Sequence, residues 1–338
     1  MDDGRRLLYV TRLCLAAAAF ILIVLVGLLI PLMFPGVFEK HLDTKSLTKP
    51  LSSTPYTWTP PDSLTIPNSP DGDLIRYGRE LVAHTAKYLG PIGSVMPASN
   101  GMNCQNCHLN SGKKNFGNNF SAVASTYPRF RGRSGTLETI EKRVNDCIER
   151  SLNGNSLEES SREMQAFVSY IRWLGKDVPK EVVPLGAGIL DLPLLDRPAD
   201  PKKGSVLYEI HCVRCHGRDG EGVKNPEGVE WVYPPLWGAD SYNTGAGILR
   251  LSRMAGYIKT NMPNGIRADS TELLNDEAWD LAAFINSMPR PTKDLSGDWP
   301  DIAAKPYDHP FGPFTDQFSE AQHKYGPFPP IVESRKQR

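Results

Sequence analysis

The residues with the clearest chemistry lie in two short motifs. The sequence contains two copies of the pattern C-x-x-C-H, Cys104-Gln-Asn-Cys107-His108 and Cys212-Val-Arg-Cys215-His216. Two thiols at this spacing can add to the two vinyl groups of one haem, and the imidazole that follows then reaches the iron as its proximal ligand. A disulfide would not require a histidine after each pair, and a zinc site would more often join the pairs at other spacings. The motifs therefore predict two covalently bound c-type haems.

The second haem has three methionines as candidates for its distal ligand, Met254, Met262 and Met288. Met262 precedes Pro263 in a loop before the closing helix, where a cytochrome c domain places its methionine. Met254 is expected within an earlier helix and Met288 after the closing one, so packing roles suit both better. We predict Met262 as the ligand, and a thioether opposite histidine raises the reduction potential, which suits an electron exit.

The first haem has no methionine after its motif until Met164, which is expected inside the closing helix. Cys147 is the alternative distal ligand. It can also be interpreted as a buried cysteine that packs as a small hydrophobe, the more usual role of a free thiol. Ligation is favoured because an exported protein would otherwise leave this thiol unpaired and this iron without a distal ligand.

Cys147 is expected on a helix that begins at Thr136 and stops at Gly154. In such a helix Arg143, Cys147 and Ser151 are four residues apart and share one face. A cation and a hydroxyl would then flank the thiol, lower its pKa and hold an anion beside it.

The elements that position these residues follow one plan twice. A helix over about 73–89 precedes the first motif, and a helix over 161–174 closes that segment, with Gly175 as its stop. A short helix from about Pro201 precedes the second motif, and a helix capped by Asn275 and running over 276–287 follows it. When the two halves are aligned with Glu163 on Glu277, Tyr170 corresponds to Phe284, which supports an internal repeat. This layout resembles the small all-helical cytochrome c domain, repeated in tandem.

The fold class expected is all-α, with two tandem cytochrome c-like domains behind one N-terminal transmembrane helix. The expected parts are a cytoplasmic N-terminus and anchor (1–38), a Pro-rich linker (39–70), domain 1 with the first haem (71–180), an inter-domain linker (181–200), domain 2 with the second haem (201–291) and an irregular tail (292–338).

The anchor is predicted from the 26 uncharged residues between Leu13 and Phe38, preceded by Arg5, Arg6 and Arg12. A cleaved signal peptide is the alternative, although its apolar region would be shorter. Either interpretation exports the rest, so we expect the haem domains on the periplasmic side of the cytoplasmic membrane. With 38 basic and 38 acidic residues, nothing indicates a nucleic-acid partner.

Taken together the segments resemble the thiosulfate dehydrogenase family of di-haem cytochromes. The likeness runs from about residue 74 to 291, over the first haem motif, the segment 143–154, Ile258-Lys-Thr-Asn-Met262-Pro263 and the segment 275–287. It implies that the first haem joins two thiosulfates into tetrathionate and that Cys147 is its distal thiolate. It further implies that the catalytic residues Arg133, Arg143 and Ser151 contact the sulfur oxyanion, and that Met262 ligates the second haem.

The resemblance also implies that electrons leave through the second haem to an external cytochrome or oxidase. Family members differ in the residue before the distal methionine, some having a lysine that can exchange onto the iron; Asn261 stands there in this chain. The alternative function is a membrane-tethered electron carrier, in which Cys147 only tunes the first haem. A di-haem peroxidase is disfavoured because no histidine suits its second ligation.

Overall fold

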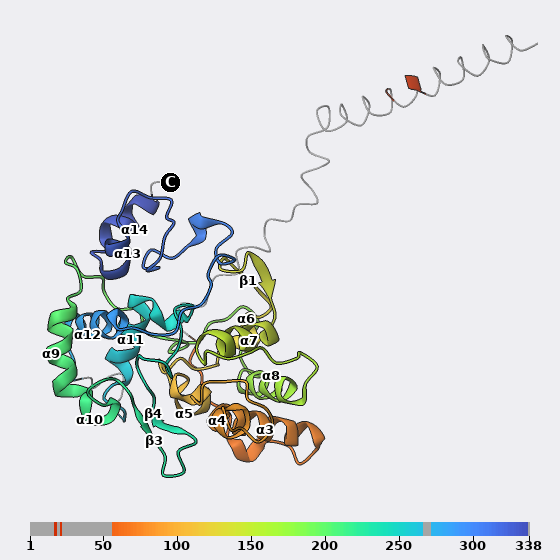
Figure 1. Ribbon diagram of the computed structural model, residues 1–338. Helices are drawn as coiled ribbons and strands as arrows, with labels where there is room; N and C mark the ends of the chain where they lie inside the picture. The colour runs from red at the N-terminus through yellow and green to blue at the C-terminus, as the bar shows by residue number, and fades with distance from the viewer. Residues whose placement is uncertain (1–16, 19–20, 22–55, 266–271, 337–338) are drawn as a thin grey trace, which may run out of the picture. The chain divides into compact units, whose positions relative to one another are not determined.

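The computed structural model describes residues 17, 18, 21, 56–265 and 272–336 (Figure 1). The chain divides into residues 1–54 and 55–338, of which the second contains both haem motifs. No helix among the described residues is long and apolar enough to cross a bilayer. The predicted span Leu13–Phe38 lies outside the described residues, apart from 17, 18 and 21.

The fold is mainly helical, with two short antiparallel hairpins. The first half contains α3 (Pro70–Ala83), α4 (Thr85–Leu89), α5 (Leu109–Gly112), α6 (Val123–Thr126), β1 (Arg129–Arg131), β2 (Thr136–Glu138), α7 (Ile140–Arg150) and α8 (Arg162–Leu174). The second half contains α9 (Pro201–His211), α10 (Val213–His216), β3 (Val223–Lys224), β4 (Trp231–Tyr233), α11 (Leu251–Asn261) and α12 (Asn275–Ser287). The tail adds α13 (Glu320–Tyr325) and α14 (Pro329–Lys336).

Most helix ends agree with the sequence prediction. Helix α8 is capped by Ser161 and ends at Gly175, which confirms both predicted boundaries. Helix α9 begins at Pro201, and α12 begins at Asn275 with Leu274 in the cap position, one residue from the prediction. The predicted helix 73–89 is broken at His84 into α3 and α4.

The predicted start of the Cys147 helix at Thr136 is wrong. Thr136 pairs with Arg131 in the β1–β2 hairpin, and the helix starts three residues later, where the Thr139 side chain accepts a hydrogen bond from the Lys142 N–H at 3.2 Å. The helix also ends before Gly154, with Ser151 as its C-cap. A threonine is a good cap at either position, so local preference could not choose between them.

In each half, the first and the last helix cross in close contact at a glycine. Helix α3 packs on α8, and α9 packs on α12 (Figure 1). A Cβ at Gly78 would lie 2.0 Å from the Ala166 carbonyl oxygen, and a Cβ at Gly204 would lie 1.9 Å from that of Asp280. Ala166 and Asp280 are equivalent in the repeat alignment of the sequence, so the structure supports that alignment.

The segments that flank the two halves are packed on them. In the predicted linker 39–70, Trp58 is buried and its indole N–H donates to the Leu174 carbonyl at 3.1 Å. The tail is irregular at first, as predicted, but it ends in α13 and α14, which periodicity had not indicated. Its buried Asp308 accepts hydrogen bonds from Arg250 and from Ser252 at the start of α11.

The crossing in the second half gives a stability prediction. Gly204→Ala should lower the free energy of unfolding by about 2 kcal/mol, because the new methyl group overpacks against the Asp280 backbone. Chemical denaturation followed by circular dichroism measures it. Gly247→Ala is the matched control, since a Cβ at Gly247 meets nothing within 4 Å. Equal stability of the two variants would contradict the close crossing.

Candidate haem sites

The first C-x-x-C-H motif is held by hydrogen bonds from the backbone N–H groups at its start. Asn103 donates its backbone N–H to the side chain of Asn106 at 2.7 Å, and the Cys104 N–H donates to the Thr85 hydroxyl at 2.9 Å. The His108 ring packs on Phe120 with centroids 4.5 Å apart.

The two motif histidines share one hydrogen-bond arrangement. The Nδ1–H of His108 donates to the Asn118 carbonyl at 2.5 Å, and that of His216 donates to the Pro234 carbonyl at 2.9 Å. A carbonyl can only accept, so Nδ1 carries the proton in both rings. Nε2 is then the nitrogen left to bind iron, which is the arrangement expected of a haem ligand.

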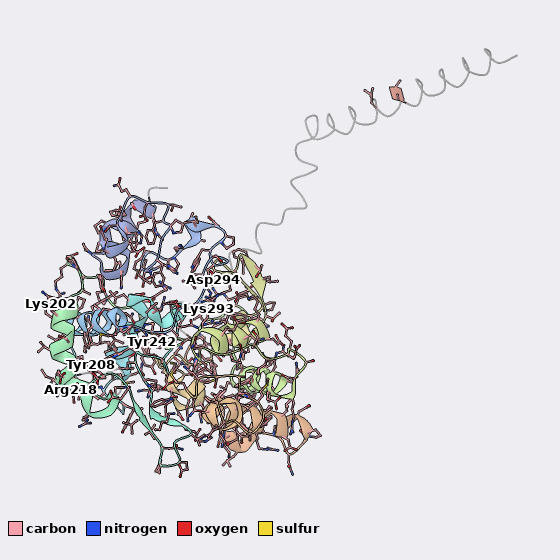
Figure 2. The ribbon with its side chains drawn as sticks, in the orientation of Figure 1. Lys202, Tyr208, Arg218, Tyr242, Lys293 and Asp294 are labelled. Carbon is pink, nitrogen blue, oxygen red and sulfur yellow. The ribbon has the colours of Figure 1, made fainter. Side chains whose placement is uncertain are left out.

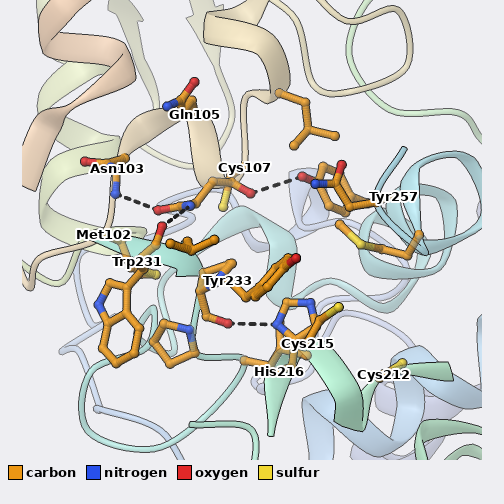
Figure 3. Close-up of a pocket in the computed structure, with 18 of the residues that line it drawn as sticks. Met102, Asn103, Gln105, Cys107, Cys212, Cys215, His216, Trp231, Tyr233 and Tyr257 are labelled. Atoms are coloured by element: carbon orange, nitrogen blue, oxygen red, sulfur yellow. Dashed lines mark hydrogen bonds between the residues drawn. The ribbon is translucent and has the colours of Figure 1, made fainter. Parts of the chain in front are cut away.

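The second motif lines a cavity of about 690 Å³, a size typical of cofactor sites. Cys212, Cys215 and His216 contribute to its wall, and both Met254 and Met262 reach it, whereas Met288 is not among the lining residues. The donor set therefore fits a haem that Cys212 and Cys215 would bind covalently and whose iron His216 and a methionine thioether would hold. The cavity extends to Cys107 of the first motif, so the two motifs border one space (Figure 3).

Cys147 lies beside His108 in the first half. Burial raises the pKa of the Cys147 thiol, but the charge of Arg143 and the interaction with His108 outweigh burial and lower the pKa to about 7. The same attraction raises the pKa of the Arg143 guanidinium. Nδ1 of His108 is bound to the Asn118 carbonyl. The ring nitrogen that remains to interact with Cys147 is therefore Nε2. His108 and Cys147 are therefore the residues that would hold the iron of the first haem.

The structure brings three of the predicted residues together around the first motif, Arg143, Cys147 and His108. Ser151 follows as the C-cap of α7, and its backbone N–H donates to the Cys147 carbonyl at 2.8 Å. Arg133 is engaged elsewhere: its guanidinium pairs with Asp146 at 2.8 Å. The contacts of Arg133, Arg143 and Ser151 with substrate stay predictions.

The pair of Arg133 and Asp146 belongs to a second, polar cavity of about 410 Å³, on the neighbouring face of α7. Burial would raise the pKa of Asp146, but Arg133 and Lys142 lower it. Arg150 lines the same cavity and forms two bonds of 2.7 Å with Asp298 of the tail. Lys293, labelled in Figure 2, pairs with Glu149 at 3.1 Å.

Two residues of this region were missed by the sequence analysis, Tyr127, which interacts with Cys147, and Arg131, which interacts with Arg143. Burial raises the pKa of Tyr127, while the charges of Arg143 and Arg131 act to lower it. Burial and the repulsion of Arg143 lower the pKa of Arg131. The charge of Arg143 and the phenol of Tyr127 thus interact with the thiol, and Arg131 interacts in turn with both. The run Arg129-Phe-Arg131-Gly-Arg133 was the sequence signal for Arg131.

The two halves meet at Asn106, the residue before Cys107. Its side-chain amide donates to the Trp231 carbonyl at 3.2 Å, and its own carbonyl accepts from the Tyr257 hydroxyl at 3.2 Å. A further link joins the distal segment of the second half to the first, because Asn261 donates to the Phe116 carbonyl at 3.0 Å. The first haem motif is therefore bound directly to the wall of the second cavity.

Comparison with known proteins agrees with this geometry. Residues 95–179 match the family model "SoxA/TsdA, cytochrome c domain", and residues 201–289 match "Cytochrome c". Two cytochrome c domains, each with a complete motif, make the protein a di-haem c-type cytochrome with two covalently bound haems. Thiosulfate dehydrogenase of Psychrobacter arcticus is 38% identical over 244 residues, 71% of each chain. That of Allochromatium vinosum is 38% identical over 241 residues, 69% of this chain and 86% of the relative.

The chain belongs to the thiosulfate dehydrogenase family. A solved structure, thiosulfate dehydrogenase (TsdBA) from Marichromatium purpuratum in its as-isolated form, is similar with a TM-score of 0.65 and 34% identity. The match covers 70% of this chain and 50% of that one, so this chain spans about half the length of that protein.

The polar cavity gives a prediction for Arg133. Arg133→Ala should lower the free energy of unfolding by about 2 to 3 kcal/mol, because it removes the 2.8 Å ion pair of the mostly buried Asp146 carboxylate and leaves Lys142, at 3.6 Å, as its nearest ion-pair partner. The loss should shrink as the pH falls and Asp146 becomes protonated, since the depressed pKa stabilises the fold only while the group is ionised. Urea denaturation at neutral and acid pH measures both effects.

The double variant Arg133→Ala/Asp146→Ala is the control, because removing both partners leaves no buried charge behind. It should be more stable than Arg133→Ala alone. A double variant that is less stable would show that the pair does not act as the structure indicates.

Proposed function

We propose that the protein oxidises two thiosulfates to tetrathionate at the first haem and passes the electrons through the second haem to an external acceptor. The observation that carries this proposal is the place of the Cys147 thiol, which lies beside the motif histidine His108 and interacts with the Arg143 guanidinium and the Tyr127 phenol. A protein that only carries electrons needs no arginines at this position. The relatives named above as thiosulfate dehydrogenases support the same substrate.

Cys147 and Arg143 divide the chemistry between them. The Cys147 thiolate bonds to the outer sulfur of one thiosulfate, giving a Cys–S–S–SO₃⁻ adduct and releasing two electrons. A second thiosulfate then attacks the adduct, which forms tetrathionate and returns the thiolate. No proton is exchanged in either step. The haems supply the one-electron acceptors for this reaction. Arg143 neutralises the sulfonate oxygens, a contact that a guanidinium makes with two donors.

Met262 has its role at the second haem, from which the electrons leave the protein. It ends α11 at the wall of the second cavity, where a thioether ligand would hold the second haem at a higher potential than a thiolate would hold the first. Electrons then move from the first haem to the second, and on to a cytochrome or oxidase outside the protein.

We also propose that the N-terminal segment anchors the protein in the cytoplasmic membrane with its haems on the periplasmic side. The uncharged run Leu13–Phe38 and the arginines before it support this proposal. An anchor would keep the second haem near membrane-bound acceptors and raise their effective concentration.

The division of roles gives a paired prediction. Cys147→Gly should abolish reduction of the haems by thiosulfate and change the absorption spectrum of the first haem alone, because it removes both nucleophile and ligand. Met262→Gly should change the second haem alone and slow electron exit, while thiosulfate still reduces the first haem. Absorption spectra of purified protein mixed with thiosulfate measure both. Full thiosulfate oxidation by Cys147→Gly would favour the simple electron carrier instead.

The anchor gives a separate prediction. Full-length protein should sediment with membranes and keep residues 13–38, because 26 uncharged residues are long enough to span the hydrocarbon core. Fractionation and N-terminal sequencing test it, with a chain beginning at residue 39 behind a cleavable export signal as the control. Native protein found soluble, with its N-terminus near Glu39, would identify the segment as a cleaved signal.

A further inference from the structure

Asn106 lies between the two haem-binding cysteines of the first motif and is shared by the two halves. Its side-chain oxygen accepts from the Asn103 N–H within the motif. Its side-chain amide and its backbone carbonyl both bond to the second half, to Trp231 and Tyr257 respectively. The backbone beside Cys107 is therefore joined by hydrogen bonds to the other haem domain.

Tyr257 connects Asn106 to the cavity of the second haem motif. It lies on α11, is 8% exposed, and lines the same cavity as His216 and Met262. Its hydroxyl meanwhile donates to the Asn106 carbonyl at 3.2 Å (Figure 3). One side chain thus contacts the backbone of the first motif and borders the site of the second haem.

We propose that Tyr257 forms the route by which electrons pass between the two haem sites. Electron tunnelling weakens less along covalent bonds and hydrogen bonds than across a van der Waals gap. The route runs from the Cys107 backbone to the Asn106 carbonyl, across the hydrogen bond to the Tyr257 hydroxyl, and through the phenol ring to the second cavity. In each transfer one iron is oxidised and the other is reduced by the same electron, and the hydroxyl keeps its proton.

Only the direction of electron flow in this route rests on the proposed function. The hydrogen bond and the shared cavity do not depend on which compound supplies the electrons. A test that injects electrons with light therefore separates the two proposals: the route can fail while thiosulfate oxidation stands, and the reverse.

The chain offers a matched control in Tyr242. This tyrosine is 4% exposed and lines the same cavity, but its hydroxyl donates to the Asn286 side chain at 3.2 Å, inside the second half (Figure 2 labels it). Tyr257→Phe and Tyr242→Phe each remove one buried hydroxyl from the cavity wall. Only the first removes a bond that crosses between the halves.

The experiment uses the full di-haem protein. A flash-excited flavin injects one electron, and absorbance then follows its redistribution between the haems, whose separate spectra come from a potentiometric titration of the same protein. Tyr257→Phe should slow the redistribution several-fold, and Tyr257→Leu should slow it further because the ring is lost as well. Tyr242→Phe should redistribute electrons at the wild-type rate.

Two results would overturn the proposal. One is a wild-type redistribution rate in Tyr257→Phe. The other is an equal slowing in Tyr257→Phe and Tyr242→Phe, which would assign the effect to general loosening of the cavity. Denaturation midpoints of the same variants show whether a change in rate accompanies a change in stability.

Discussion

Both haem domains depend on one hydrogen bond, from Nδ1 of the motif histidine to a backbone carbonyl. It fixes the tautomer, and with it the nitrogen that can bind iron. It also forces the chain after each motif to return past the histidine within about ten to twenty residues. In the first half that return includes Asn118 at a positive φ of 58°, a conformation that asparagine tolerates better than most residues. The Phe116 carbonyl on the same return then receives Asn261, the neighbour of Met262. The ligand environment of one haem is thereby tied to that of the other.

The two faces of helix α7 carry charged residues with different roles. One face carries Arg143 and Cys147 towards His108, and there the charge of Arg143 favours the thiolate form of Cys147. The adjacent face carries Lys142, Asp146 and Arg150, whose charges are matched within the protein by Arg133 and Asp298. The formal charge of the whole chain is zero, so this local arrangement, rather than the overall balance, determines the charge around Cys147.

The sequence was informative where the chemistry is local. A covalent haem needs cysteines and histidine within five residues, and a helix such as α8 shows its buried face, its cap and its stop in a single stretch. Arg133 and Asp146 are thirteen residues apart, and only the hairpin turn between β1 and β2 decides that they meet. The same turn removed Thr136 from the helix. Tyr257 gave no signal at all, because its partner Asn106 lies 151 residues away and its importance depends on how the two halves pack.

The tail lies outside both matched domains, yet it touches each half. Asp298 holds Arg150 at the end of α7, and the backbone N–H of Trp299 donates to the Arg133 carbonyl. Ten residues after Asp298, Asp308 holds Arg250 and Ser252 at the start of α11. A segment fastened at both ends in this way resists hinge opening between the halves. Mechanically, this cross-link opposes relative motion of the two redox centres within residues 56–336, so electron transfer between them should respond little to the viscosity of the surrounding solvent.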